Sequence, residues 1–310
     1  MMDTELLLRN CINVKDGYPM RLSENLLAAY DAMSPEFSAR ARCTAGVKLS
    51  FITAARELSF RYEIISWCRS VNICDLFENG VLTGSARMAD MQSHGTVSFI
   101  RRGTGEARID IWLPNTCGVR ILEADIGNWR PAPAPLERVL LLGDSILQGI
   151  ATYHPSCTLA DLLLRRPGTE GVNQSVGGAY FDPDHLEPVG FAPDRILIAM
   201  GANDAWNAPE TYRERIPAYF RRVRELFPDT PVTAVSPVWG TSVETNGEYR
   251  KNLDEVRTLI CESAGRVRAG YIDGTDLIPH HRDFYNEDGC HPNDLGFTHY
   301  AMNLERALQF

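Results

Sequence analysis

The stretch Val139-Leu140-Leu141-Leu142-Gly143-Asp144-Ser145 decides the fold. Four consecutive apolar residues are too few for a stable helix, and they predict a strand that is buried on both faces. A glycine ends the run, and Asp144 and Ser145 open a new segment. Open α/β sheets bind their ligands at the carboxyl ends of the strands, so a nucleophilic serine could act at this position. The alternative is that Ser145 only caps a following helix.

Downstream of this stretch, apolar runs alternate with helical patterns. The patterns predict strands at residues 196–200 and 232–235, and helices over about 209–227, 249–260 and 294–308. Pro217 lies inside the first of these helices and predicts a kink or a break. Strands that alternate with helices indicate a parallel sheet covered on both faces, and we expect a flavodoxin-like three-layer α/β/α domain.

Upstream, the pattern changes to the period of two that is typical of strands with one buried face. Val47, Leu49 and Phe51 alternate with polar residues, and Asn79-Gly80 lies between two short apolar runs, which is a strong hairpin signal. A helix is predicted near residues 23–33. The rest of the first 125 or so residues predicts an antiparallel β-sandwich.

The segment Pro131-Ala132-Pro133-Ala134-Pro135 separates the two patterns. Alternating proline favours an extended, semi-rigid backbone, as in linkers between domains. We therefore predict a jelly-roll-like β-sandwich over residues 1–130, a linker over 131–136 and the α/β domain over 137–310.

Composition excludes several classes of protein. The 310-residue chain has 44% hydrophobic and 23% charged residues, as globular proteins do, and its net charge of −9 argues against nucleic acid or an anionic membrane as partner. The N-terminus lacks the features of a signal peptide, and no apolar run is long enough to span a membrane. The eight cysteines include no C-x-x-C pair, which favours reduced thiols. We expect a cytoplasmic protein, with an oligomeric state that the sequence leaves open.

A serine hydroxyl is a weak nucleophile until a base removes its proton. Among the seven histidines, His291 is the one in an Asp288-Gly289-Cys290-His291 segment, where an acid precedes it by three residues. In one helical turn this spacing can place a carboxylate beside an imidazole, although Asp and His also fall three apart by chance. Two further segments end predicted strands: Asn173-Gln174-Ser175-Val176-Gly177-Gly178 and Gly201-Ala202-Asn203-Asp204.

The order and spacing of these four segments resemble the SGNH, or GDSL-type, hydrolases. The resemblance implies that Ser145 is the nucleophile, that His291 is its base, and that Asp288 orients His291. It also implies an oxyanion hole formed by the N–H groups of Ser145 and Gly178 and the side-chain amide of Asn203, with Gly177 as the alternative to Gly178. Such a site uses neither a metal nor an organic cofactor. The α/β-hydrolases are excluded because Ser145 is not followed by the second glycine of G-x-S-x-G.

The N-terminal half is similar to the β-sandwich domain that precedes the hydrolase domain in some bacterial members of this family. Such members include carbohydrate esterases that remove acetyl groups, which implies a small acyl ester of a sugar or oligosaccharide as substrate. Trp206 and Trp239 follow two of the predicted strands and could stack on a sugar ring, although tryptophan more often serves packing. We expect Cys290 to be a small buried residue, and His280 and His281 to be ordinary residues rather than metal ligands.

Two other functions remain open from the sequence. One is hydrolysis of lipid, aryl or thioester substrates by the same triad, which the lack of a long apolar lid segment slightly disfavours. The other is carbohydrate binding without catalysis, against which the intact set of four segments counts.

Overall fold

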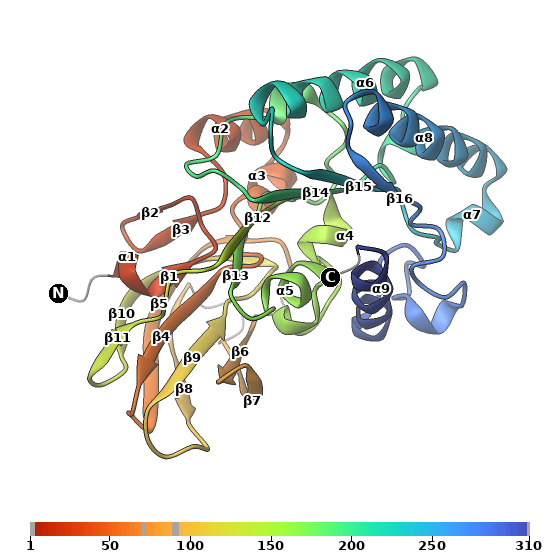
Figure 1. Ribbon diagram of the computed structural model, residues 1–310. Coiled ribbons are helices and arrows are strands. Elements are labelled where there is room, and N and C mark those ends of the chain that lie inside the picture. The colour runs from red at the N-terminus through yellow and green to blue at the C-terminus, as the bar shows by residue number, and fades with distance from the viewer. Residues whose placement is uncertain (1–3, 70–71, 89–92, 309–310) are drawn as a thin grey trace.

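The computed structural model describes residues 4–69, 72–88 and 93–308. It contains a parallel sheet covered by helices and, before it in the chain, a region of antiparallel strands (Figure 1). No helix in the described part of the chain is both long and apolar enough to cross a membrane.

The parallel sheet carries the residues that the sequence singles out. Its strands are β12 (Glu137–Gly143), β13 (Thr169–Asn173), β14 (Arg195–Ala199), β15 (Val232–Val235) and β16 (Gly270–Ile272). They lie in the order β13-β12-β14-β15-β16, and every pair is parallel. This is the flavodoxin-like order. The second strand, β13, lies on one side of the first strand, β12, and the later strands lie on its other side. The predicted α/β fold is confirmed.

Helices cover both faces of this sheet (Figure 1). One face carries α2 (Glu24–Met33), α3 (Pro35–Ala41), α6 (Pro209–Leu226) and α8 (Gly247–Arg266), and the other carries α4 (Ser145–Gln148), α5 (Leu159–Leu164) and α9 (Asp294–Ala307). Short helices form at α1 (Thr4–Leu7) and α7 (Ser242–Thr245). Pro217 does not end α6, because the buried side chains of Tyr212, Ile216 and Phe220 anchor the helix on both sides of it.

The antiparallel part of the chain, which we call the β-rich region, has two sheets and a hairpin in the described residues. One sheet contains β1 (Leu8–Arg9), β4 (Lys48–Thr53), β6 (Ile73–Glu78), β7 (Val81–Arg87), β9 (Ala107–Trp112) and β11 (Trp129–Pro131). The other contains β5 (Glu57–Trp67), β8 (His94–Ile100) and β10 (Cys117–Asp125), and the hairpin is β2 (Asn13–Lys15) with β3 (Tyr18–Met20). Alternate side chains of both sheets share one apolar core, as the period of two predicts.

The predicted hairpin at Asn79-Gly80 is confirmed. Both residues have positive φ, 50° and 82°, and Glu78 pairs with Val81 across the turn. A two-residue turn with positive φ at both positions matches the twist of the flanking strands, and asparagine followed by glycine adopts it most readily.

Helix α2 packs on the parallel sheet rather than on the β-rich region. Leu26, Leu27 and Tyr30 of α2 are buried in the same core as Leu142 and Ile198 of the sheet. The helix predicted near residues 23–33 is thus present, but it belongs to the parallel sheet and its covering helices, which we call the α/β layer. Its packing places the following helix, α3, beside the carboxyl end of the sheet.

Candidate active site

Ser145 lies immediately beyond the carboxyl end of β12. Asp144, rather than Ser145, is the N-cap of α4, and its carboxylate accepts the N–H of Ile146 at 3.0 Å. The close turn requires Gly143, since a Cβ atom there would lie 2.6 Å from the carbonyl oxygen of Ala199. The Ser145 hydroxyl is therefore free of a capping role.

The structure brings His291 and Asp288 to Ser145 although 146 residues separate Ser145 from His291. The Nε2 atom of His291 is 2.8 Å from the Ser145 Oγ, and its Nδ1 is 2.8 Å from the Asp288 Oδ2. This is the order of contacts in which an imidazole can take a proton from a serine hydroxyl while a carboxylate fixes its tautomer.

The expected helical turn between Asp288 and His291 does not form. The segment is a tight turn with Gly289 at φ +64°, and the Asp288 Oδ1 accepts the backbone N–H groups of Cys290 and His291, each at 2.9 Å. Partial burial alone would raise the pKa of Asp288, but these hydrogen bonds and that from the His291 ring outweigh it and lower the pKa. Asp288 is thus held as a carboxylate against the imidazole.

The two adjacent glycines have different hydrogen bonds. The N–H of Gly177 donates to the Gln148 Oε1 at 2.6 Å, whereas the N–H of Gly178 has no acceptor among the described residues. Gly178 has φ +85°, a conformation that glycine adopts without strain. This difference favours Gly178 over Gly177 as the donor to an external oxyanion.

Asn203 lies in the turn that follows β14, close to the glycine segment. Its amide nitrogen donates to the carbonyl oxygen of Ala179 at 2.9 Å. Because a primary amide has two N–H donors, this bond orients the group and leaves a second N–H for a ligand.

Two buried carboxyl groups connect the segments. Asp144 is 2% exposed and accepts the N–H groups of Ile146 and Gly201, while Asp204 is 1% exposed and accepts the N–H of Phe181 at 3.1 Å. Burial raises the pKa of Asp144 to about 6 and that of Asp204 to about 7. Asp144 thus joins the serine and asparagine segments, and Asp204 joins the asparagine and glycine segments.

The raised pKa of Asp204 predicts a stability effect. In the unfolded chain this carboxyl ionises near pH 4, so between about pH 4 and 7 the folded state holds the extra proton and loses stability as the pH rises. Asp204→Asn should remove up to about 4 kcal/mol of this decline, because three pKa units correspond to that free energy. Urea unfolding of both proteins across this range tests it. Parallel stability curves would contradict the assignment.

Helix α3 reaches the glycine segment from a part of the chain that carries no motif. Arg40 donates from its Nη1 to the carbonyl oxygen of Gly177 at 3.1 Å, and Gln148 donates to the Arg40 carbonyl oxygen at 3.0 Å. A Cβ atom on Gly178 would meet Arg40 at 2.9 Å and Phe37 at 3.2 Å. Arg40 and Phe37 therefore form a wall beside Gly178, which sequence patterns did not indicate.

The two candidate tryptophans differ in exposure. Trp206 is 60% exposed and stacks on Tyr249 with ring centroids 4.3 Å apart. Trp239 is 7% exposed, stacked on His280 at 5.2 Å and touched edge-on by Tyr285. Trp206 offers a ring face to a ligand, whereas the contacts of Trp239 are those of a packing residue.

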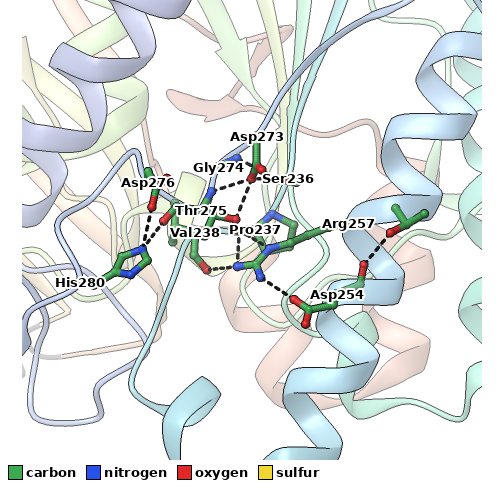
Figure 2. A network of polar contacts seen from close by, with 11 residues as sticks. Ser236, Pro237, Val238, Asp254, Arg257, Asp273, Gly274, Thr275, Asp276 and His280 are labelled. Carbon is green, nitrogen blue, oxygen red and sulfur yellow. Dashed lines mark hydrogen bonds and ion pairs between the residues drawn. The ribbon is translucent and has the colours of Figure 1, made fainter.

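The loop that carries Trp239 is held by a polar network (Figure 2). Arg257 of α8 donates to the carbonyl oxygens of Pro237 and Val238, at 3.0 and 3.3 Å, and Ser236 accepts the N–H of Gly274 at 2.9 Å. His280 contacts Thr275 and Asp276 in the same network. This network explains why Trp239 is fixed in the core, and it gives His280 a structural role.

Cys290 contributes little nucleophilic character beside His291. Burial raises the pKa of its thiol to about 12, so the reactive thiolate is absent at neutral pH.

The segments that form this site fall within a match to a known protein family. Residues 141–298 match the model of the GDSL-like lipase/acylhydrolase family, and this span is just over half of the chain. The chain belongs to that family. The matched span of this GDSL-like protein begins within β12 and contains all four segments that form the site. No curated protein matches the sequence.

Solved structures share the fold over nearly the whole chain. A protein from Bacteroides ovatus classed as a GDSL-like lipase has 20% identity and a TM-score of 0.82, covering 98% of this chain and 95% of its own. The salicylyl-acyltransferase SsfX3 of a tetracycline biosynthetic pathway has 20% identity and a TM-score of 0.78, with coverage of 97% and 93%. A family two carbohydrate esterase from Cellvibrio japonicus has 20% identity and a TM-score of 0.64, with coverage of 86% and 89%.

Proposed function

We propose that this GDSL-like protein hydrolyses small acyl esters, acetyl esters in particular, of carbohydrates. Ser145 is the nucleophile, His291 the general base and then the general acid, and Asp288 the residue that orients His291. The observation that carries the proposal is the unbroken series of 2.8 Å contacts from the Ser145 Oγ through the His291 ring to the Asp288 carboxylate.

The reaction follows from this arrangement. The Ser145 Oγ attacks the acyl carbonyl carbon while its proton moves to the His291 Nε2. The resulting oxyanion accepts hydrogen bonds from the Ser145 and Gly178 N–H groups and the free N–H of Asn203. Collapse of this intermediate breaks the ester bond, and His291 gives the proton to the leaving alcohol. Water then attacks the acyl-enzyme with the same base, which releases the acid and restores Ser145.

Two observations support a carbohydrate substrate. Trp206 presents an exposed ring next to Asn203, and an aromatic face suits the apolar face of a sugar ring. Several structures with the same fold are carbohydrate esterases, one of them described as an acetyl xylan esterase from Butyrivibrio proteoclasticus. We assign no substrate contact to Trp239, because its ring is covered by His280 and Tyr285.

We also propose the domain division that the sequence predicts. The jelly-roll-like β-sandwich occupies residues 1–130 and the hydrolase domain 137–310, with 131–136 as linker. Helices α2 and α3 belong to the N-terminal range by sequence but pack on the parallel sheet, and α3 brings Arg40 to the glycine segment. We infer that this part of the chain helps to position the glycine segment.

A substrate panel tests the proposed activity. We expect turnover of p-nitrophenyl esters to fall as the acyl chain lengthens from acetyl, and acetylated oligosaccharides to release acetate. Preference for long acyl chains would favour a lipid hydrolase. Preference for an aryl ester or a thioester over every acetylated sugar would favour an aryl esterase or a thioesterase. Carbohydrate binding without any turnover would support the non-catalytic alternative.

Asn203→Ala should lower kcat by about 10²- to 10³-fold, as loss of one side-chain oxyanion donor does. The Michaelis constant should change little, because the amide binds the oxyanion more strongly than the ground-state carbonyl oxygen. Steady-state kinetics on the preferred acetyl ester measure this. Asn207→Ala is the matched control, since Asn207 lies on the same loop and its side-chain amide donates to the Asn203 carbonyl oxygen at 3.4 Å rather than facing the oxyanion donors. A loss confined to the Michaelis constant would assign Asn203 to substrate binding instead.

The pH dependence should show loss of kcat/KM on the acid side. Only the neutral His291 ring can accept the Ser145 proton, whereas the hydrogen bonds that lower the pKa of Asp288 keep that carboxylate charged to more acidic pH. A profile that stays flat through mildly acidic pH would exclude His291 as the base.

A further inference from the structure

A pocket lined by basic and aromatic side chains lies between the β-rich region and the α/β layer, away from the candidate active site. It has a volume of about 260 Å³, far above the 10–15 Å³ or so that one water needs. Its walls come from β4, β6, β9, the Asn79-Gly80 turn and the segment that joins α5 to β13, regions that lie close together in Figure 1. The lining residues with ionisable or aromatic side chains are Lys48, Phe77, Arg108, Asp110, Trp112, Arg165 and Arg166.

This pocket and the candidate active site lie at opposite ends of the parallel strands. Arg165 and Arg166 precede β13 at its amino end, whereas Ser145 follows the carboxyl end of the adjacent, parallel β12. Seven strand residues at about 3.3 Å each place the two sites roughly 20 Å apart. A ligand in the pocket would not contact the catalytic groups.

The lining is strongly basic in a chain whose net charge is −9. The residues that line the pocket include four basic side chains and, within the described part of the chain, one carboxylate, that of Asp110. This carboxylate lies 3.4 Å from the Lys48 Nζ and 3.1 Å from the Arg108 Nε, and it also accepts the Ser50 hydroxyl at 2.5 Å. The buried Asp161 carboxyl also interacts with Arg165 and Lys48, and burial raises its pKa well above the usual value. Positive charge in the pocket therefore exceeds negative charge.

The cations are held in place before any ligand arrives. Lys48 is 2% exposed, and its ammonium group lies 4.9 Å from the centre of the Trp112 ring. The Arg165 guanidinium lies 5.0 Å from the centre of the Phe77 ring and donates to the Ser156 carbonyl oxygen at 3.2 Å. Burial of an ammonium group is unfavourable unless anions surround it, and aromatic contacts reduce the side-chain entropy lost on binding.

We propose that this pocket binds a small molecule that carries a phosphate group. A tetrahedral phosphate can accept hydrogen bonds from an ammonium and from guanidinium groups that approach from different sides, as these do from β4, β9 and the segment after α5. Because Lys48 and Arg108 belong to the β-rich region and Arg165 to the α/β layer, the bound phosphate holds the two together.

Calorimetric titration of the full chain tests this site, with inorganic phosphate and glycerol 3-phosphate as probes and sodium chloride at matched ionic strength as reference. We expect saturable binding of one phosphate group per chain and an increase in Tm with either phosphate probe. Binding of the ester alone would still assign the pocket to phosphate and would show that the organic part is needed.

Arg165→Met should weaken this binding by about tenfold or more, since it removes one charge-assisted donor and keeps much of the apolar side-chain volume. Lys48→Met should do the same, and if that variant folds poorly Arg165→Met still decides the outcome. Arg222→Met is the matched control, because Arg222 lies exposed on α6 and pairs with Glu225. Ser145→Ala should bind phosphate as the parent does. No saturable binding, or equal weakening by Arg165→Met and Arg222→Met, would overturn the proposal.

Discussion

Ser145→Ala should lower kcat on the preferred acetyl ester by about 10⁶-fold, the size of effect seen when the nucleophile of a comparable triad is removed. The physical reason is that the Ser145 Oγ is the nucleophile in contact with the His291 Nε2 in the described part of the chain, and burial raises the pKa of the neighbouring Cys290 thiol to about 12. A small rate above that of water should remain, because the oxyanion donors still bind the transition state.

Kinetics of the purified variant measure this effect, together with a thermal unfolding curve that verifies the fold. Ser98→Ala is the matched control, since Ser98 is an exposed serine of β8 with no contact to the site. Loss of less than about tenfold in Ser145→Ala would exclude Ser145 as the nucleophile.

His291→Ala should produce a loss of similar size, and adding it to Ser145→Ala should cause little further loss. Nucleophile and base act as a unit, so removing either disables the same step and the effects do not add. Asp288→Asn should cost about 10⁴-fold, because an amide can hold the imidazole in the wrong tautomer. His281→Ala, at an exposed histidine paired with Asp283, is the control. Additive losses in the double variant would show that His291 acts independently of Ser145.

These variants separate catalysis from support of the fold. Asp288 also accepts two backbone N–H groups, so Asp288→Asn retains one acceptor oxygen for that turn while the charge is lost. Asp144 and Asp204 carry no assigned step in the reaction, and their buried carboxyls hold the three oxyanion-donor segments together. Substitution of Asp204 should therefore change stability and oxyanion geometry, whereas substitution of Asp288 should act on the histidine.

Much of the fold follows from local patterns in the sequence. The run at Val139 and the two later apolar runs predict β12, β14 and β15 within two residues, because a strand buried on both faces needs a short, continuous apolar segment. The hairpin at Asn79-Gly80 is equally local, since a two-residue turn with positive φ restricts the residues that form it. The helices of residues 209–227, 249–260 and 294–308 follow from their apolar stripes.

The same local patterns were insufficient where packing decides. The helix predicted near residues 23–33 forms, but the sequence did not indicate that α2 and α3 pack on the parallel sheet, because an amphipathic stripe does not specify which apolar surface will cover it. Pro217 lies within a continuous helix for a related reason, since tertiary contacts of the flanking residues outweigh the missing hydrogen bond. Trp239 is covered by His280, a contact between residues 41 positions apart that no spacing rule anticipates.

The sequence by itself determined that a serine follows a buried strand and that glycine, asparagine and Asp-x-x-His segments follow in a family-like order, because strand ends and turn residues are marked locally. Only the tertiary structure decided that backbone N–H groups of a turn hold the Asp288 carboxylate. It also decided that the Gly177 N–H donates to Gln148, whereas the Gly178 N–H has no acceptor among the described residues, and that Arg40 lies beside both glycines. These features depend on which atoms meet across segments distant in the chain, and a one-dimensional pattern specifies the presence of a donor without specifying its partner.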